Sequence, residues 1–126
     1  MKERNAVGSE QIHVAGMTHV SLSVRDLDKS LAFYRGVLGL SYLVEPFEGV
    51  VFDGREAILM LSSGTALCLQ QHLANAGEPF DPHRTGLDHI ALQVDSEEIL
   101  ADWSSRLTDA GIDHSGVKAP RLRFDD

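Results

Sequence analysis

Cysteine, aromatic residues and positive charge are all scarce in this chain of 126 residues. Cys68 is the only cysteine, which excludes an intrachain disulfide and a zinc site built from several thiolates. The sequence holds 11 Lys and Arg against 19 Asp and Glu, a formal net charge of -8, without any run of basic residues. A surface of this kind disfavours nucleic acid and anionic membranes as partners.

Long apolar runs are absent too, so no stretch predicts a transmembrane helix. Residues 1–15, MKERNAVGSEQIHVA, contain charges, Gly and Ser but lack the apolar centre of a signal peptide. We therefore expect residues 1–15 to be a flexible leader or a remnant of the expression vector, and the protein to be cytoplasmic. Hydrophobic residues at 43% and charged residues at 24% are typical of a globular domain, and the length suits a single one, over 16–126.

Two stretches alternate polar and apolar residues, which predicts half-buried strands. They are MTHVSLSV at 17–24 and GLDHIALQV at 86–94. Each carries a histidine, His19 or His89, on the side opposite its apolar stripe. The repeated pattern indicates two related modules, 16–73 and 86–126, joined by a polar, proline-containing loop at 74–85.

A helical pattern follows each predicted strand. In RDLDKSLAFYRGVLGL, either Asp26 or Asp28 is placed to cap the start of the helix. In DSEEILADWSSRLTDAG the corresponding candidates are Asp95 and Ser96. Both patterns end at a glycine suited to a left-handed C-cap, Gly39 and Gly111.

Further strands are predicted after each helix. In the first module, 40–46 and 50–52 look extended, and EAILMLSSGTALCLQQH predicts two strands joined by a turn at 62–64. In the second, only HSGV and RLRF follow the helix, so this module is short of a strand. A longer chain, a sequence lacking internal residues, or a strand from another subunit would each complete the sheet, which otherwise keeps an unpaired edge.

The paired histidines predict a metal site. Each imidazole needs a hydrogen-bond partner, water or a metal, and one divalent ion is able to use two neutral imidazoles at once. The alternative is that each histidine bonds only a backbone carbonyl. Because His19 and His89 occupy equivalent places in the repeat, we favour metal ligation over that alternative.

The first module carries a recognisable motif, a histidine followed by V-x-D-L-x-x-S-x-x-F-Y-x-x-x-L-G. Together with GLDHIALQV and the second helix, it resembles the vicinal oxygen chelate superfamily over about Met17–Val117. That group contains glyoxalase I, bleomycin-resistance proteins, fosfomycin-resistance enzymes and extradiol dioxygenases. The resemblance implies an α+β fold of paired βαβββ modules, forming an open, curved mixed sheet around a metal-binding cleft.

The same resemblance assigns roles to individual residues. His19 matches the ligand on the superfamily's first strand and His89 the ligand on its fifth, whereas Cys68 falls where glyoxalase-type members have a glutamate. By strand parity Cys68, Gln70 and His72 share one face, which makes them candidates for lining the substrate cleft. The superfamily's last carboxylate ligand follows a motif that begins here at Phe124, and it has no counterpart within these 126 residues.

These features lead to one leading function and one alternative. We expect a homodimeric, metal-dependent enzyme that acts on a small oxygen-rich molecule by glyoxalase-like lyase or isomerase chemistry, or by dioxygenase chemistry. Its cofactor would be one divalent ion: zinc, nickel, manganese or iron. The alternative is a protein of bleomycin-resistance type, which binds and sequesters a drug without catalysis.

Overall fold

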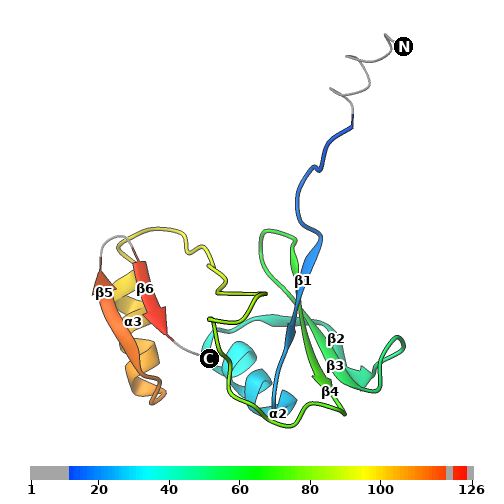
Figure 1. Cartoon of the computed structure of the whole chain (residues 1–126). Helices are drawn as coiled ribbons and strands as arrows, with labels where there is room; N and C mark the ends of the chain where they lie inside the picture. The colour runs from blue at the N-terminus through cyan, green and yellow to red at the C-terminus, as the bar shows by residue number, and fades with distance from the viewer. Residues whose placement is uncertain (1–11, 119–120, 125–126) are drawn as a thin grey trace.

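The structure is a computed structural model that describes residues 12–118 and 121–124. It is an α+β fold with a mixed, four-stranded sheet in the order β1-β4-β3-β2 and a separate antiparallel pair, β5-β6. Figure 1 shows the larger sheet formed by the first half of the chain and the smaller one by the second. The expected leader lies outside the described residues up to residue 11, and 12–17 are exposed without regular structure.

The first module begins with β1 (His19–Ser23) and a helix, as the alternation and the helical spacing predict. The helix starts as α2 (Leu27–Leu31) and widens into the π-helix η1 (Ala32–Val37). Asp26 is the N-cap, because its Oδ1 accepts a hydrogen bond from the backbone N–H of Lys29 at 3.1 Å. The predicted left-handed glycine follows at Gly39, with φ 78°.

Removing this cap is expected to destabilise the protein measurably. Asp26→Ala leaves the Lys29 N–H without its partner, and we expect a loss of about 1 kcal/mol in the free energy of unfolding. Asp28→Ala is the control, because the side chain of Asp28 is exposed and its one ion pair among the described residues is with exposed Arg55 at 3.7 Å. Its loss should change stability by less than about 0.5 kcal/mol. Urea denaturation checks both values, and equal losses would contradict the capping role.

Three strands complete the first module: β2 (Ser41–Glu48), β3 (Gly54–Met60) and β4 (Ala66–His72). The strands β3 and β4 form the hairpin predicted around residues 62–64, with Met60 opposite Ala66. Val50–Phe52, expected as a strand piece, is instead part of the turn region between β2 and β3. The first strand, β1, pairs in parallel with β4, so β1 and β2 are the edges of the sheet.

One face of this sheet packs on α2 and η1 to form the core. The strands contribute alternate apolar residues, and the helix contributes its i, i+4 stripe, as in a two-layer α+β unit. The buried cluster consists of Leu22, Val24, Leu27, Leu31, Tyr34, Ala57, Leu59, Leu67 and Leu69. Residues between them along the strands therefore point to the opposite face of the sheet.

The second half contains α3 (Leu100–Asp109), β5 (His114–Lys118) and β6 (Arg121–Phe124). The two strands confirm HSGV and RLRF as strand pieces. The expected helix start at Asp95 or Ser96 is wrong, because α3 begins after Ile99, which makes no side-chain cap. The preceding residues form a turn instead, in which the Leu100 N–H donates to the Glu97 carbonyl at 3.1 Å.

The predicted strand at 86–94 is not formed: the segment has no β-ladder. The first module supplies the reason, since β1 takes its entire ladder from β4, the last strand of that module. In the second half the described chain holds α3, β5 and β6, and it contains no counterpart of β4 after β6. An alternating segment without a neighbouring strand has no ladder in which to pair its backbone groups, so in the described chain it lies outside both sheets.

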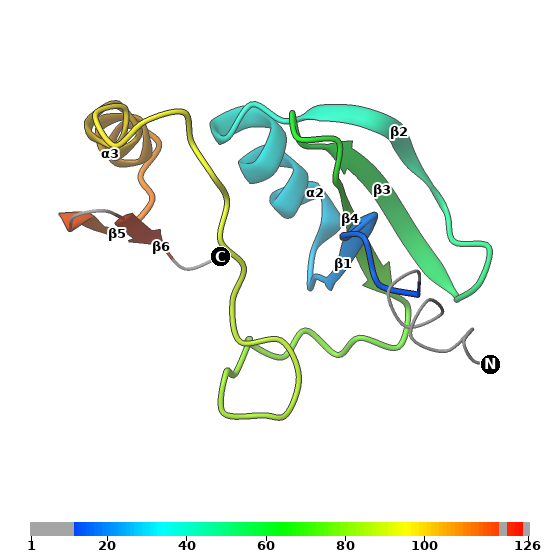
Figure 2. The same cartoon turned by 90° about the horizontal axis from the view of Figure 1, so that it is seen from above.

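The segment at 86–94 is not detached from the rest of the fold. Figure 2 shows it passing α2 on the side away from the sheet, and Ile90 packs against the buried cluster of the first module. A second contact joins the halves, because the rings of Phe33 and Phe124 lie 5.1 Å apart. Among the described residues, no helix is both long enough and apolar enough to cross a membrane.

Candidate functional site

The face of the four-stranded sheet that turns away from α2 is the candidate site. In Figure 2, α2 and η1 cover one face, and no helix or strand in the described part of the chain covers the other. Pairing places polar residues of β1 and β4 next to apolar residues of β3 and β2 on this open face. The set comprises His19, Ser21, Ser23, Cys68, Gln70, His72, Glu56, Ile58, Met60, Val44 and Phe47. We call it the open face.

His19 lies at the start of β1 and is exposed. Its side chain points to the open face, because the alternating residues Val20 and Leu22 pack toward the core. The ring Nδ1 is 3.0 Å from the Thr18 hydroxyl, which orients the imidazole. The other ring nitrogen, Nε2, has no protein partner among the described residues, so it is free to act as a ligand.

His89 is held in a similar way on the segment 86–94. Its Nδ1 is 2.7 Å from Oδ1 of Asp88, and its side chain is 74% exposed. A carboxylate that accepts the Nδ1–H fixes the tautomer that leaves the Nε2 lone pair available, a common arrangement behind metal-ligating histidines. The chemistry of the donors therefore fits a divalent ion at either histidine.

The two histidines do not meet in one chain. His19 belongs to the open face, whereas the segment that carries His89 runs past α2 on the other side of the molecule. Within the described residues, no three His, Cys, Asp or Glu side chains are grouped closely enough to hold a metal ion. One chain thus supplies suitable donors without a complete ligand set.

The three predicted cleft residues lie together on β4, on the open face. Cys68 is buried at 7% exposure and forms no disulfide, and no described residue provides it with a charged partner that would activate its thiol. Gln70 donates from Nε2 to Oε2 of Glu56 at 3.4 Å. His72 packs on Phe52, with ring centroids 4.4 Å apart, beside a hollow of about 380 Å³ lined by Asp53, His72, Leu73 and Ala74.

Glu56 is a candidate that sequence reasoning missed. It is 8% exposed, and its side chain stands on the open face between Gln70 on β4 and Phe47 on β2. Counting outward from the turn at 62–64 pairs residue 56 with residue 70, so the juxtaposition was present in the sequence. A carboxylate in the middle of a sheet face is the signal that could have identified it.

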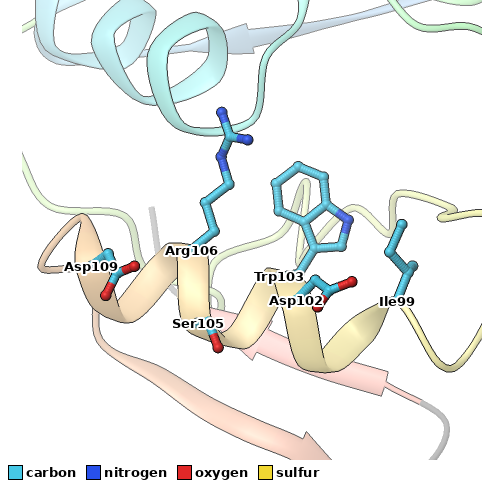
Figure 3. Close-up of a pocket in the computed structure, with 6 residues that line it drawn as sticks. All are labelled: Ile99, Asp102, Trp103, Ser105, Arg106 and Asp109. Carbon is cyan, nitrogen blue, oxygen red and sulfur yellow. The ribbon is translucent and has the colours of Figure 1, made fainter.

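A second hollow, of about 470 Å³, runs along α3 (Figure 3). Arg106 reaches from this helix toward η1, where it donates to the Gly36 carbonyl at 3.5 Å, and its guanidinium lies 5.5 Å from the Trp103 ring. The lining residues all come from the start and body of one helix: Ile99, Asp102, Trp103, Ser105, Arg106 and Asp109. Binding sites usually combine polar groups from several elements, so the open face is the better candidate.

Comparison with known proteins agrees with this architecture. Residues 16–118 match the family model of the glyoxalase/bleomycin resistance protein/dioxygenase superfamily. A putative ring-cleaving dioxygenase of Bacillus subtilis, MhqA, is 32% identical over 82% of this chain. The match spans 33% of the length of that relative.

Solved structures with the same fold include two relevant neighbours. A glyoxylase/bleomycin resistance protein/dioxygenase domain from Frankia has a TM-score of 0.75 and 33% identity, covering 84% of this chain and 81% of that one. A variant of the fosfomycin resistance protein FosX from Listeria monocytogenes, solved with Mn(II) and a dihydroxypropylphosphonic acid, has a TM-score of 0.62 and 20% identity, covering 82% and 75%. The chain belongs to the glyoxalase/bleomycin resistance protein/dioxygenase superfamily.

Proposed function

We propose that this chain is a metal-dependent enzyme, or the metal-binding part of one, that acts on a small oxygen-rich molecule in the cytoplasm. The observation that carries the proposal is His19, an oriented and exposed imidazole at the edge of an otherwise uncovered, partly polar sheet face. Two relatives add support, because one is named a ring-cleaving dioxygenase and the other was solved with Mn(II). Lyase, isomerase and dioxygenase chemistry all remain within this proposal.

The proposed site combines His89 with residues of the open face, and each would have its own role. His19 and His89 would hold a divalent ion through Nε2, with Thr18 and Asp88 orienting the two rings. The ion, when bound, supplies Lewis-acid polarisation of a substrate oxygen. The hydroxyls of Ser21 and Ser23 and the amide of Gln70 would orient the substrate, while Ile58 and Phe47 exclude water on the other side.

We propose that the site is completed between two copies of the chain. Residues 16–126 would act as one domain, and the His89 segment of one copy would lie over the open face of its partner. Three features support this arrangement: the open face lacks a cover, β1 is a sheet edge, and the alternating segment 86–94 has no ladder of its own in the described chain. A homodimer would satisfy all three together.

Metal content tests the proposal. We expect the purified chain, loaded with zinc, nickel, manganese or ferrous iron and then desalted, to retain about one ion per chain by elemental analysis. The ion should be removed by a chelator and should return on reloading. If none of the four metals is retained, the alternative takes its place: a binding protein that sequesters a small molecule on the same face without a metal.

A further inference from the structure

Glu56 occupies an unusual position for a carboxylate. It is 8% exposed, and it lies on the open face rather than in the helix-packed core. Its side chain has one hydrogen bond in the described part of the chain, the long 3.4 Å contact from Gln70, and no ion pair there. An ionised carboxylate accepts about four hydrogen bonds, so most of the acceptor capacity of Glu56 is unused.

A structural role does not explain this arrangement. Burying a carboxylate without a cation or several donors is unfavourable, and proteins usually pair such groups fully. The neighbours of Glu56 on its own face are instead Phe47 on β2, Ile58 two residues along β3 and Gln70 on β4. One side of the carboxylate is therefore apolar and the other is an amide. Figure 2 shows no helix or strand of the described chain over this face of the sheet.

Glu56 is also placed apart from the proposed metal ligand. His19 aligns with Met60 through Ala66, four residues along the sheet from Glu56 and two strands away. Strand spacings put their Cα atoms roughly 16 Å apart, too far for one ion to bind both side chains. Glu56 therefore lies at a part of the open face remote from His19, where it would contact a different part of a ligand from the part near the metal.

We propose that Glu56 binds a hydrogen-bond donor of the substrate, a hydroxyl or a protonated amine attached to an apolar group. Gln70 holds the carboxylate in place through Oε2, which leaves Oε1 for the ligand. Phe47 and Ile58 form the wall against which the apolar group rests. This inference rests on the proposed function in taking the open face as the substrate site, but it does not require a metal.

Binding of three small probes to the ¹⁵N-labelled full chain tests the proposal. Catechol carries hydroxyl donors, protonated benzylamine carries an ammonium, and benzoate offers the same ring with a carboxylate that Glu56 should repel. We expect catechol or benzylamine to shift the amide signals of β3 and β4, and benzoate to leave them unchanged. The relative strength of the first two distinguishes a hydroxyl ligand from an ammonium ligand.

Substitution then separates a binding role from a structural one. Glu56→Gln keeps the shape and should weaken the donor-bearing probes at least 10-fold, while Glu48→Gln, an exposed glutamate on β2, should not change their binding. Because the variant removes a poorly paired buried charge, its Tm should stay equal or rise by about 2–5 °C.

Three results would overturn the proposal: equal binding of benzoate, unchanged probe binding in Glu56→Gln, or no wild-type binding of either donor-bearing probe. A Tm several degrees lower in Glu56→Gln would also overturn it, since it would reveal a structural carboxylate. Metal retention is measured independently of all these, so failure of the metal proposal is distinguishable from failure of this one.

Discussion

Gly54→Ala is expected to lower the free energy of unfolding by about 3–5 kcal/mol. Gly54 opens β3 with φ 152°, a region that side chains rarely adopt. A Cβ placed there would lie 2.2 Å from the Gln71 carbonyl oxygen and 3.0 Å from the His72 Cα. Both neighbours are backbone atoms of β4, so relief of the clash requires the two strands to separate where they pair. Urea denaturation of the two proteins measures the loss.

Gly64→Ala is the matched control for Gly54→Ala. Gly64 also has a positive φ, 94°, but a Cβ there meets no atom within 4 Å. Its substitution therefore carries only the backbone strain, about 1–2 kcal/mol. Similar losses in the two variants would show that the close approach of β3 to β4 contributes nothing. Separation of β3 from β4 in Gly54→Ala should also shift the amide signals of Glu56 and His72, because both residues lie at the same end of the open face.

The first module was predictable because its signals are local and agree with one another. The alternation around His19, the cap at Asp26, the glycine at Gly39 and the turn at 62–64 each specify one element, and the elements they predict fit one sheet. The open face follows from the same alternation. Glu56 was not identified as a candidate from the sequence, because its surroundings depend on which residue of β4 pairs with it.

The second half shows where local pattern fails. The stretch at 86–94 alternates as clearly as β1, but a strand also needs a neighbour, and the described chain provides none. The helix α3 likewise starts after Ile99 although Asp95 and Ser96 are good capping residues, since a turn through Glu97 precedes it. Convergence of His19 and His89 was inferred from the repeat, but in the described chain the segment 86–94 passes α2 on the side away from the sheet.

Single substitutions of the two histidines provide the starting point for testing the shared site. If His19 and His89 are ligands, His19→Ala and His89→Ala should each lose the bound ion, from about one per chain to less than about 0.1. His83→Ala is a matched control, because His83 is exposed and its Nδ1 lies 2.9 Å from Asp81, as His89 lies beside Asp88. Hydrogen bonds from the His83 backbone and ring lower the pKa of Asp81, which keeps the carboxylate of the control pair ionised at neutral pH.

Mixing the two variants that have lost the metal, His19→Ala and His89→Ala, is then expected to restore metal binding in part. In a dimer with shared sites, one chain of the His19→Ala and His89→Ala pair supplies an intact His89 and the other an intact His19. One of the two sites is therefore complete, and the other lacks both ligands. After unfolding and refolding together in equal amounts, half of the dimers are mixed, so metal content should recover to about one ion per four chains. Sites formed within single chains would show no recovery, and that result would remove the two-copy arrangement while leaving the histidine assignment in place.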